Sequence, residues 1–305
     1  MPMDDDYINQ VQLLIQLLPY IAKEEVFALK GGTAINLFHL DMPRLSVDID
    51  LTYMPIADRE SSLRDVDEAF DRIMEDIEDV GCVSVGRSFD SAGNKTGISV
   101  SKGIVRIKIE TSPVLRGTVL PPRTMATCNA VTERFGFARM RVLSFEDLYA
   151  GKIHAALDRQ HPRDLFDIKA LYENEGLTND LFRVFMVYVA SSHRPMHELL
   201  NPSVSLSEEL LNRELVGMTH GSMSKKTLDE TGAYLLADIQ KRLTGDIANF
   251  LLSLHDGNPD FELIELPEAR HLPAVRWKLL NLKKLKTENI NKHMDQRKAL
   301  EALFQ

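Results

Sequence analysis

Two aspartates, Asp48 and Asp50, stand one residue apart in the segment 46–53, which is otherwise rich in residues that favour β-strands. Successive side chains of a strand point to opposite faces, so both carboxylates are predicted to project from one face and Ile49 from the other. Two carboxylates on one face repel each other unless a cation lies between them, and oxygen ligands of this kind suit Mg²⁺. The spacing therefore predicts a divalent-metal site on this strand.

A glycine-rich turn precedes the aspartates. Gly31, Gly32 and Thr33 lie between a short apolar segment at 26–29, read as a strand or a helix end, and a helix-spaced segment at 34–40. A turn at a helix start presents backbone N–H groups, and Thr33 adds a hydroxyl, so this turn offers donors to a phosphate. Together with the aspartates, it predicts a site for a magnesium-bound nucleotide.

A third carboxylate is expected beside the aspartates. The segments 83–88, 97–101 and 104–111 read as antiparallel strands, and Glu110 lies on the charged face of the last one. Three carboxylates can hold one or two Mg²⁺ (or Mn²⁺) ions that bridge nucleotide phosphates and activate an attacking hydroxyl. The alternative is that Glu110 is a surface residue of the strand.

The two parts of the chain differ in kind. Residues 1–140 mix helices and strands, whereas residues 141–305 read as almost wholly helical, which predicts an α+β fold in two domains, a mixed-sheet domain and an all-α domain. Helical patterns are read at 7–18, 62–77, 145–159, 163–173, 177–190, 205–215, 225–255 and 274–285. The pairs Ser62/Asp65 and Ser144/Asp147 have the spacing of capping boxes at two of these helix starts.

A charged cluster marks the beginning of the helical part. Lys152 lies among small residues of the predicted helix 145–159, and Arg163 and Asp164 follow a proline turn. Small neighbours let a helix approach another element closely, so Lys152 is expected to point its charge into a cleft and neutralise a triphosphate. The alternatives are a lysine whose stem covers apolar surface, and a helix cap with a structural ion pair at Arg163 and Asp164.

Composition limits the setting of the protein. The chain has 305 residues and a net charge of −9, which argues against a general nucleic-acid binder. Segment 276–298 is the exception, with eight basic residues and two acidic ones. It is a solvated helix face, a surface for RNA or a contact for a protein partner. The two cysteines, Cys82 and Cys128, have no metal-ligand spacing and favour a reducing compartment.

No apolar run reaches the length of a membrane span, and no signal sequence is read. A cytoplasmic protein without a membrane partner is therefore expected.

The residues singled out above lie in segments that resemble one known family. Residues 29–37 (LKGGTAINL), 44–51 (RLSVDIDL), 107–110 (IKIE) and 152–167 resemble, in order, motifs of the AbiEii/AbiGii nucleotidyltransferase toxins, to which the MenT toxins are related. Segments 191–202 and 275–282 look like later helical segments of that family, so the resemblance covers most of the chain. The chain departs from minimal nucleotidyltransferases at Thr33, where serine is common, and in a longer gap before the first aspartate.

The resemblance implies a polymerase-β-like nucleotidyltransferase domain followed by a helical domain. It implies a toxin of a type IV toxin–antitoxin or phage-defence pair, with a cognate antitoxin as partner. It also implies transfer of a nucleotide from an NTP to RNA, with the tRNA 3′ end as the acceptor. The roles that it carries over are metal binding for Asp48 and Asp50, phosphate contact for Gly32 and Thr33, a hydroxyl near the metal for Ser46, and a requirement for activity at Lys152 and Asp164.

Three functions remain open on the sequence. In the first, an RNA hydroxyl attacks the α-phosphate of an NTP while Glu110 deprotonates or orients it, and Lys152 and Arg163 neutralise phosphate charge. In the second, the acceptor is a protein or a small cationic molecule. In the third, the chain is a nucleotide-binding or partner-binding module without turnover, and the intact cluster of charged residues argues against it.

Overall fold

The computed structural model describes residues 4–78, 83–89, 95–202 and 206–304, and the chain divides into two compact units. The sheet unit comprises residues 1–148 and 215–222, and the helical unit comprises residues 149–214 and 223–305. The predicted domain boundary at 140 falls inside a strand, Arg139–Val142, and residues 215–222 return to the sheet unit. Cys82 lies outside the described residues, and Cys128 is a free thiol.

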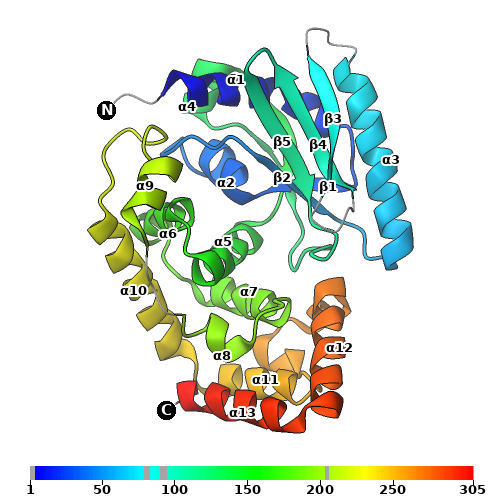
Figure 1. Cartoon of the computed structure of the whole chain (residues 1–305), viewed down its shortest axis with the longest axis vertical. Helices are drawn as coiled ribbons and strands as arrows, with labels where there is room; N and C mark the ends of the chain where they lie inside the picture. The colour runs from blue at the N-terminus through cyan, green and yellow to red at the C-terminus, as the bar shows by residue number, and fades with distance from the viewer. Residues whose placement is uncertain (1–3, 79–82, 90–94, 203–205, 305) are drawn as a thin grey trace. The chain divides into compact units, whose positions relative to one another are not determined.

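A seven-stranded mixed sheet forms the centre of the sheet unit, in the order β3-β4-β5-β2-β1-β7-β6. Figure 1 labels its strands β1 to β5. Its strands are β1 (Phe27–Lys30), β2 (Ile49–Tyr53), β3 (Ser84–Phe89), β4 (Lys95–Lys102), β5 (Val105–Thr111), β6 (Arg123–Ala126) and β7 (Arg139–Val142). Neighbouring strands run antiparallel except β2 with β5 and β1 with β7, which are parallel. The predicted mixed sheet and the three antiparallel strands β3, β4 and β5 are confirmed.

Helices pack on the sheet through faces that the sequence pattern indicates. They are α1 (Asp5–Ile21), α2 (Gly31–Ala34), the π-helical turn η1 (Ile35–His39), α3 (Arg59–Glu78) and α4 (Asn129–Phe135). In α1 the side chains of Val11, Leu14 and Leu18 recur at helical spacing and are fully buried. Helices α1 and α3 pack against each other and against the sheet, so they close one core.

Helix α3 begins earlier than the capping pattern predicts. The carboxylate of Asp58 accepts a hydrogen bond from the backbone N–H of Ser61 at 2.9 Å, and the helix starts at Arg59. The predicted capping box of Ser62 and Asp65 is therefore wrong, because both residues already lie inside the helix. Asp65 instead accepts a hydrogen bond from the hydroxyl of Tyr53 at 2.7 Å.

The helical unit contains no strand among its described residues. Its elements are α5 (Phe145–Arg159, whose first turn belongs to the sheet unit), α6 (Pro162–Asn174), α7 (Asn179–Ala190), α8 (Met196–Leu199), α9 (Glu208–Glu214), α10 (Lys225–Arg242), α11 (Gly245–His255), η2 (Phe261–Ile264), η3 (Pro267–His271), α12 (Pro273–Glu288), α13 (Ile290–Glu301) and η4 (Ala302–Phe304). The second capping box is confirmed, because the Ser144 hydroxyl accepts a hydrogen bond from the Asp147 N–H at 3.0 Å. The predicted helix at 225–255 is two helices, separated by Leu243 and Thr244, and the second begins at Gly245, where φ is +55°.

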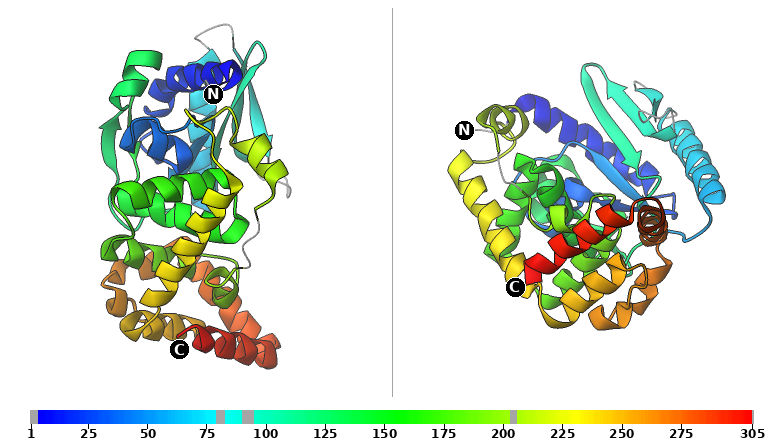
Figure 2. Two further views of the ribbon diagram at one scale, coloured as in Figure 1. Left: turned by 90° about the vertical axis from the view of Figure 1, so that its left-hand side faces the viewer. Right: turned by 60° about the horizontal axis from the view of Figure 1, so that its bottom comes forward.

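The last long helix, α13, was not predicted. It packs against α11 (Figure 2), and two histidines connect the two helices. The His255 ring donates from Nε2 to the carbonyl of His293 at 2.9 Å, and the His293 ring donates to the carbonyl of His255 at 3.1 Å. The two ring centroids are 4.3 Å apart. Burial lowers the pKa of His255, which is consistent with a neutral ring in this arrangement.

The free energy of unfolding is expected to fall as the pH drops from 6.5 toward 4. Burial, the largest cause, lowers the pKa of His154 to about 4, and its Nε2 is buried without a hydrogen-bond partner. The unfolded chain takes up this proton near pH 6.5 and the folded chain does not, so protons favour unfolding. Allowing for the partial exposure of the ring, the loss at pH 4 is about 2 kcal/mol. Urea unfolding at pH 7.5, 5.5 and 4.5 measures it, and His154→Gln must show a shallower pH dependence than the wild type.

Candidate active site

Asp50 lies in the middle of the sheet between two charged neighbours. It pairs in register with Lys30 of the antiparallel strand β1 and with Glu110 of the parallel strand β5. Directly paired residues of adjacent strands share a face of the sheet, so the three side chains leave the same face. The structure thus brings Glu110 beside Asp50, as the sequence predicts. Lys30, to which the sequence assigned no role, joins them.

The charge of Lys30 depends on this neighbourhood. Burial lowers the pKa of Lys30, and the negative charge of Asp50 partly offsets that effect. Glu110 is more exposed, with 41% of its side-chain surface accessible, and lies 3.8 Å from the ammonium of Lys108. The sheet therefore presents a partly exposed carboxylate, Glu110, beside the more enclosed Asp50 and Lys30, which carry opposite charges.

Asp48 comes just before β2, which begins at Ile49 rather than at 46 as predicted. The backbone at Asp48 is fixed by Thr33, whose buried hydroxyl donates a hydrogen bond to the Asp48 carbonyl. The same hydroxyl oxygen lies 3.1 Å from Oγ of Ser46. The sequence predicted that the Thr33 hydroxyl would donate to a phosphate. In this structure the hydroxyl donates to the Asp48 carbonyl instead and so positions the backbone that carries Asp48.

Both glycines of the turn permit close approach of a charged side chain. At Gly31, where φ is +74°, a Cβ atom would lie 2.5 Å from Oδ2 of Asp50. At Gly32, a Cβ atom would lie 2.5 Å from Nη2 of Arg44 and 3.0 Å from Oγ of Ser46. A side chain at either position would therefore displace Asp50 or Arg44, which explains why the turn needs two glycines.

Arg44 is a site residue that the sequence reasoning missed. Its side chain is 2% exposed, and its Nη1 donates to the carbonyl of Leu45 at 2.8 Å. The segment 215–222 holds this part of the chain in place, because Leu45 N–H donates to the carbonyl of Met218 at 2.7 Å and Arg44 forms an isolated antiparallel bridge with Thr219. Arg44 opens the segment 44–51 that resembles the family, and that resemblance was the sequence signal for it.

The aspartates fit a magnesium ion better than a closed metal cage. Among the residues described, no group of three or more His, Cys, Asp or Glu side chains is arranged to hold a metal ion. Asp48, Asp50 and Glu110 therefore do not form the three-carboxylate cluster expected from the sequence. Mg²⁺ is usually held by one or two carboxylates, with water and substrate phosphates as its other ligands. The half-buried Asp48 and Asp50 beside a glycine turn fit that pattern.

In the helical unit, Lys152 lies in a buried ion-pair network. Its ammonium is 2.8 Å from Oδ1 of Asp164 and 3.0 Å from Oδ2 of Asp167, and Nε of Arg159 is 2.7 Å from Oδ2 of Asp164. Burial acts to raise the pKa of Asp164, but the charges of Lys152 and Arg159 outweigh burial and hold that pKa well below its usual range. Two cations and two carboxylates thus balance one another, so Lys152 is not a lysine that reaches into solvent.

Arg163 is also ion-paired within the helical unit. Its Nη2 lies 3.3 Å from Oε2 of Glu214, and Nε2 of His161 lies 3.4 Å from the same oxygen. Arg163 and Asp164 thus both take part in ion pairs, as the structural alternative predicted. The cap of helix α6 is His161, whose Nδ1 accepts a hydrogen bond from the N–H of Arg163 at 3.3 Å. A role for Lys152, Asp164 or Arg163 toward a nucleotide stays a prediction.

Thr33→Val is expected to lower both stability and any activity of this site. The change removes the hydroxyl that donates to the Asp48 carbonyl and leaves that acceptor without its partner, at a cost of about 1–2 kcal/mol. Chemical unfolding measures this cost, and Thr33→Ser, which keeps the hydroxyl, is the matched control. Equal stability of the Val and Ser variants would show that the hydrogen bond does not hold the segment.

Comparison with known proteins identifies the arrangement. A protein-family profile described as "Nucleotidyl transferase AbiEii toxin, Type IV TA system" matches residues 12–281. The structure is similar to that of MenT4, a nucleotidyltransferase toxin from Mycobacterium tuberculosis, with 17% sequence identity and a TM-score of 0.60. The similarity covers 90% of this chain and 93% of that chain, and at this identity it shows a shared fold. No curated protein sequence matches. The predicted α+β fold of a nucleotidyltransferase is thereby confirmed. Among the described helices, none is long and apolar enough to cross a membrane.

Proposed function

The chain belongs to the AbiEii family of nucleotidyltransferase toxins of type IV toxin–antitoxin systems, and from that premise we propose that it transfers NMP from an NTP to an RNA, with the tRNA 3′ end as acceptor. The observation that carries the proposal is the register of Lys30, Asp50 and Glu110 across three adjacent strands, next to a turn of two glycines. The family implies an NTP substrate and an antitoxin partner. We propose action in the cytoplasm, where both RNA and NTPs are present.

The proposed reaction is an in-line displacement at the α-phosphate. The 3′-hydroxyl oxygen of the acceptor forms a bond to the α-phosphorus, the bond from that phosphorus to the bridging oxygen breaks, and pyrophosphate leaves. The hydroxyl proton passes to Glu110, whose partial exposure leaves it accessible to an acceptor. Asp48 and Asp50 would hold Mg²⁺, which would supply positive charge to the triphosphate.

The glycine turn and its neighbours orient the nucleotide. The backbone N–H groups of Gly31 and Gly32 and the hydroxyl of Ser46 are proposed as phosphate contacts, because the two glycines leave no side chain in the way. Lys30 and Arg44 add positive charge close to the same turn. Thr33 acts indirectly, through the backbone of Asp48. Lys152 and Asp164 are proposed as required residues of the helical unit, with Arg163 as a further phosphate partner once it leaves Glu214.

A basic face of α12 is proposed as part of the RNA site. Lys283, Lys284 and Lys286 are exposed, and Trp277 and Leu280 of the same helix are 54% and 60% exposed. Cationic side chains contact RNA phosphates, and an exposed aromatic ring can stack on an unpaired base. The chain is otherwise acidic, so this face is the part of the helical unit best suited to RNA.

Reversing Lys283, Lys284 and Lys286 to Glu is expected to raise the KM for RNA by about tenfold and to flatten its dependence on salt, because fewer counterions are released on binding. The KM for NTP is expected to change little. The matched control reverses Lys225, Lys226 and Lys241 of α10, which gives the same change in net charge. Identical RNA kinetics in the two triple variants, across a salt series, would remove α12 from the acceptor site.

The acceptor is tested by incubating the purified protein with each α-labelled NTP in turn, together with total RNA and a protein extract. The proposal predicts labelled RNA. Labelled protein would move the acceptor to the second function that the sequence left open, and label in neither would support a binding module. A small DNA-binding protein encoded beside the gene would support the toxin–antitoxin or phage-defence assignment.

A further inference from the structure

One lysine of the basic segment 276–298 is not on the surface. Lys278 of α12 is 5% exposed, and its Nζ donates a hydrogen bond to the backbone carbonyl of Arg194 at 2.6 Å. No carboxylate in the described part of the chain lies within ion-pair distance of this ammonium. A buried charge with one neutral partner keeps much of its desolvation cost, so the fold retains an uncompensated cation here.

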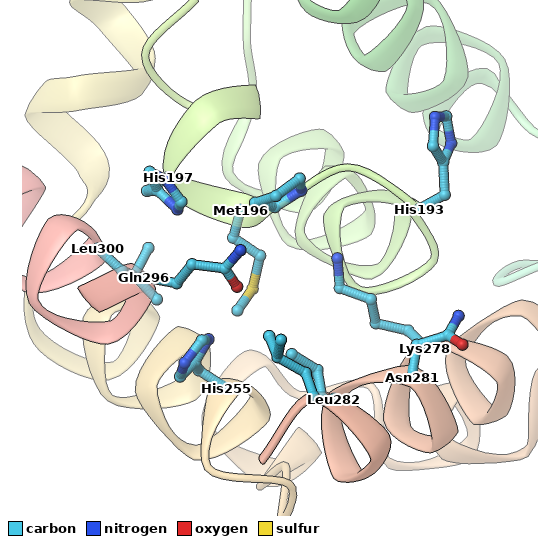
Figure 3. A pocket seen from close by; sticks show the side chains of 11 residues that line it. His193, Met196, His197, His255, Lys278, Asn281, Leu282, Gln296 and Leu300 are labelled. Carbon is cyan, nitrogen blue, oxygen red and sulfur yellow. The ribbon is translucent and has the colours of Figure 1, made fainter. Parts of the chain in front are cut away.

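The ammonium borders a cavity of about 120 Å³ that lies within the helical unit. The cavity is bounded by residues of α8, α11, α12 and α13, and none of the described residues that line it is acidic. Figure 3 shows Lys278 beside Met196, with the amide of Gln296 and the ring of His197 on the other side of Met196. Polar side chains of α8, α12 and α13 thus line a space large enough for several water molecules or one phosphate group.

Two acidic side chains around Arg194 and His197 already have basic partners. Asp158 forms an ion pair with Arg194 at 3.2 Å, and Glu198 lies 3.7 Å from Arg194 and 3.9 Å from His197. Gln296, by contrast, makes no hydrogen bond to another described residue. Burial, with no opposing acidic group, lowers the pKa of Lys278 to about 8, so the ammonium still carries most of its charge at pH 7. The described lining of the cavity therefore offers the Lys278 ammonium and the unbonded Gln296 amide, and it contains no acidic side chain.

We propose that this cavity binds a phosphate group, with the Lys278 ammonium as its charge partner and Gln296 and His197 as further hydrogen-bond donors. An anion here would pair with the buried cation that the protein itself leaves uncompensated. The site goes beyond the proposed transfer reaction, because it uses only residues of the helical unit and none of the residues assigned to the nucleotide. The phosphate comes either from a mononucleotide or from an RNA strand.

The methyl group of Met196 gives a local readout of binding. Protein labelled with ¹³C in its methionine methyl groups is titrated with inorganic phosphate at constant ionic strength, and the Met196 signal is assigned with Met196→Leu. The expected result is a saturable shift of that signal, which chloride does not reproduce. In Lys278→Met the affinity falls by about tenfold or more, whereas Lys278→Arg keeps it. A shift that does not saturate, or that is equal in Lys278→Met and wild type, would overturn the proposal.

Two further measurements keep the test decisive. Gln296→Leu changes a half-exposed side chain, so this variant is expected to fold normally. Its phosphate affinity is expected to fall about threefold, and an unchanged affinity would count against the site. Repeating the titration in Asp48→Asn must give the same phosphate affinity, since the proposed nucleotide site is separate. Titration with AMP and with an oligoribonucleotide lacking terminal phosphates then identifies the source of the phosphate. Tighter binding of AMP assigns the cavity to a mononucleotide, and tighter binding of the oligoribonucleotide assigns it to an RNA strand.

Discussion

Asp48→Asn and Asp50→Asn are each expected to reduce nucleotide transfer roughly thousandfold or more, with the fold intact. Each change removes one negative charge from the two carboxylates that fit Mg²⁺, and Asp50→Asn also takes away the charge paired in register with Lys30. Both side chains are only half-buried, so the free energy of unfolding is expected to change by less than about 1 kcal/mol. Initial rates with labelled NTP and thermal melting measure the two effects.

The matched control is Glu75→Gln, which removes the same charge from an exposed position of α3 in the same unit. It is expected to keep wild-type activity and stability. Turnover at the wild-type rate by purified Asp48→Asn or Asp50→Asn, with Mg²⁺ present, would end the assignment of these residues to the metal. Loss of activity together with loss of fold would assign them a structural role.

Lys152→Met is expected to destabilise the protein by about 3–5 kcal/mol and to abolish transfer. The substitution removes the ammonium that lies beside the buried carboxylates of Asp164 and Asp167, while Arg159 still pairs with Asp164. The low pKa of Asp164 shows how strongly this carboxylate depends on its cations. Urea unfolding monitored by circular dichroism measures the stability. Lys152→Arg, which keeps a cation, is expected to retain most of the stability.

The double variant Lys152→Met/Asp167→Asn separates charge balance from a direct role of the lysine. Restored charge balance is expected to return much of the lost stability, because one uncompensated carboxylate is removed. Activity is expected to remain absent if Lys152 is itself required, as proposed. A stable double variant with full activity would show that Lys152 serves only to neutralise Asp164 and Asp167.

The parts of the fold that could be predicted are those with a long local pattern. The buried stripe of α3 and the alternation of β5 each extend over enough residues to be read from the sequence. The charged face of β5 correctly suggested that Glu110 lies beside Asp50. Strands β6 and β7 have four residues each, too few for a pattern, and their place in the sheet depends on pairing with β1. The sequence therefore gave no signal for them.

The details of the site depended on contacts between distant segments. The hydroxyl of Thr33 is suited equally to a phosphate or to a backbone carbonyl, and only the fold shows that Asp48 takes it. The return of residues 215–222 to Leu45 is a pairing that no local pattern encodes. Lys278 reads as one more basic residue of a charged helix, and its burial depends on how α8, α11 and α13 surround it. Side-chain types were thus readable from the sequence, whereas their partners were not.

The most direct test of nucleotidyl transfer compares two labels on the same NTP. The protein is incubated with Mg²⁺, RNA and an NTP labelled either at the α-phosphate or at the γ-phosphate, with Asp48→Asn as the inactive control. Attack at the α-phosphorus predicts that the α-label enters the RNA while the γ-label is released as pyrophosphate in equal amount, and that neither happens in the variant. Entry of the γ-label into the RNA, or transfer of the α-label that persists undiminished in Asp48→Asn, would contradict the account.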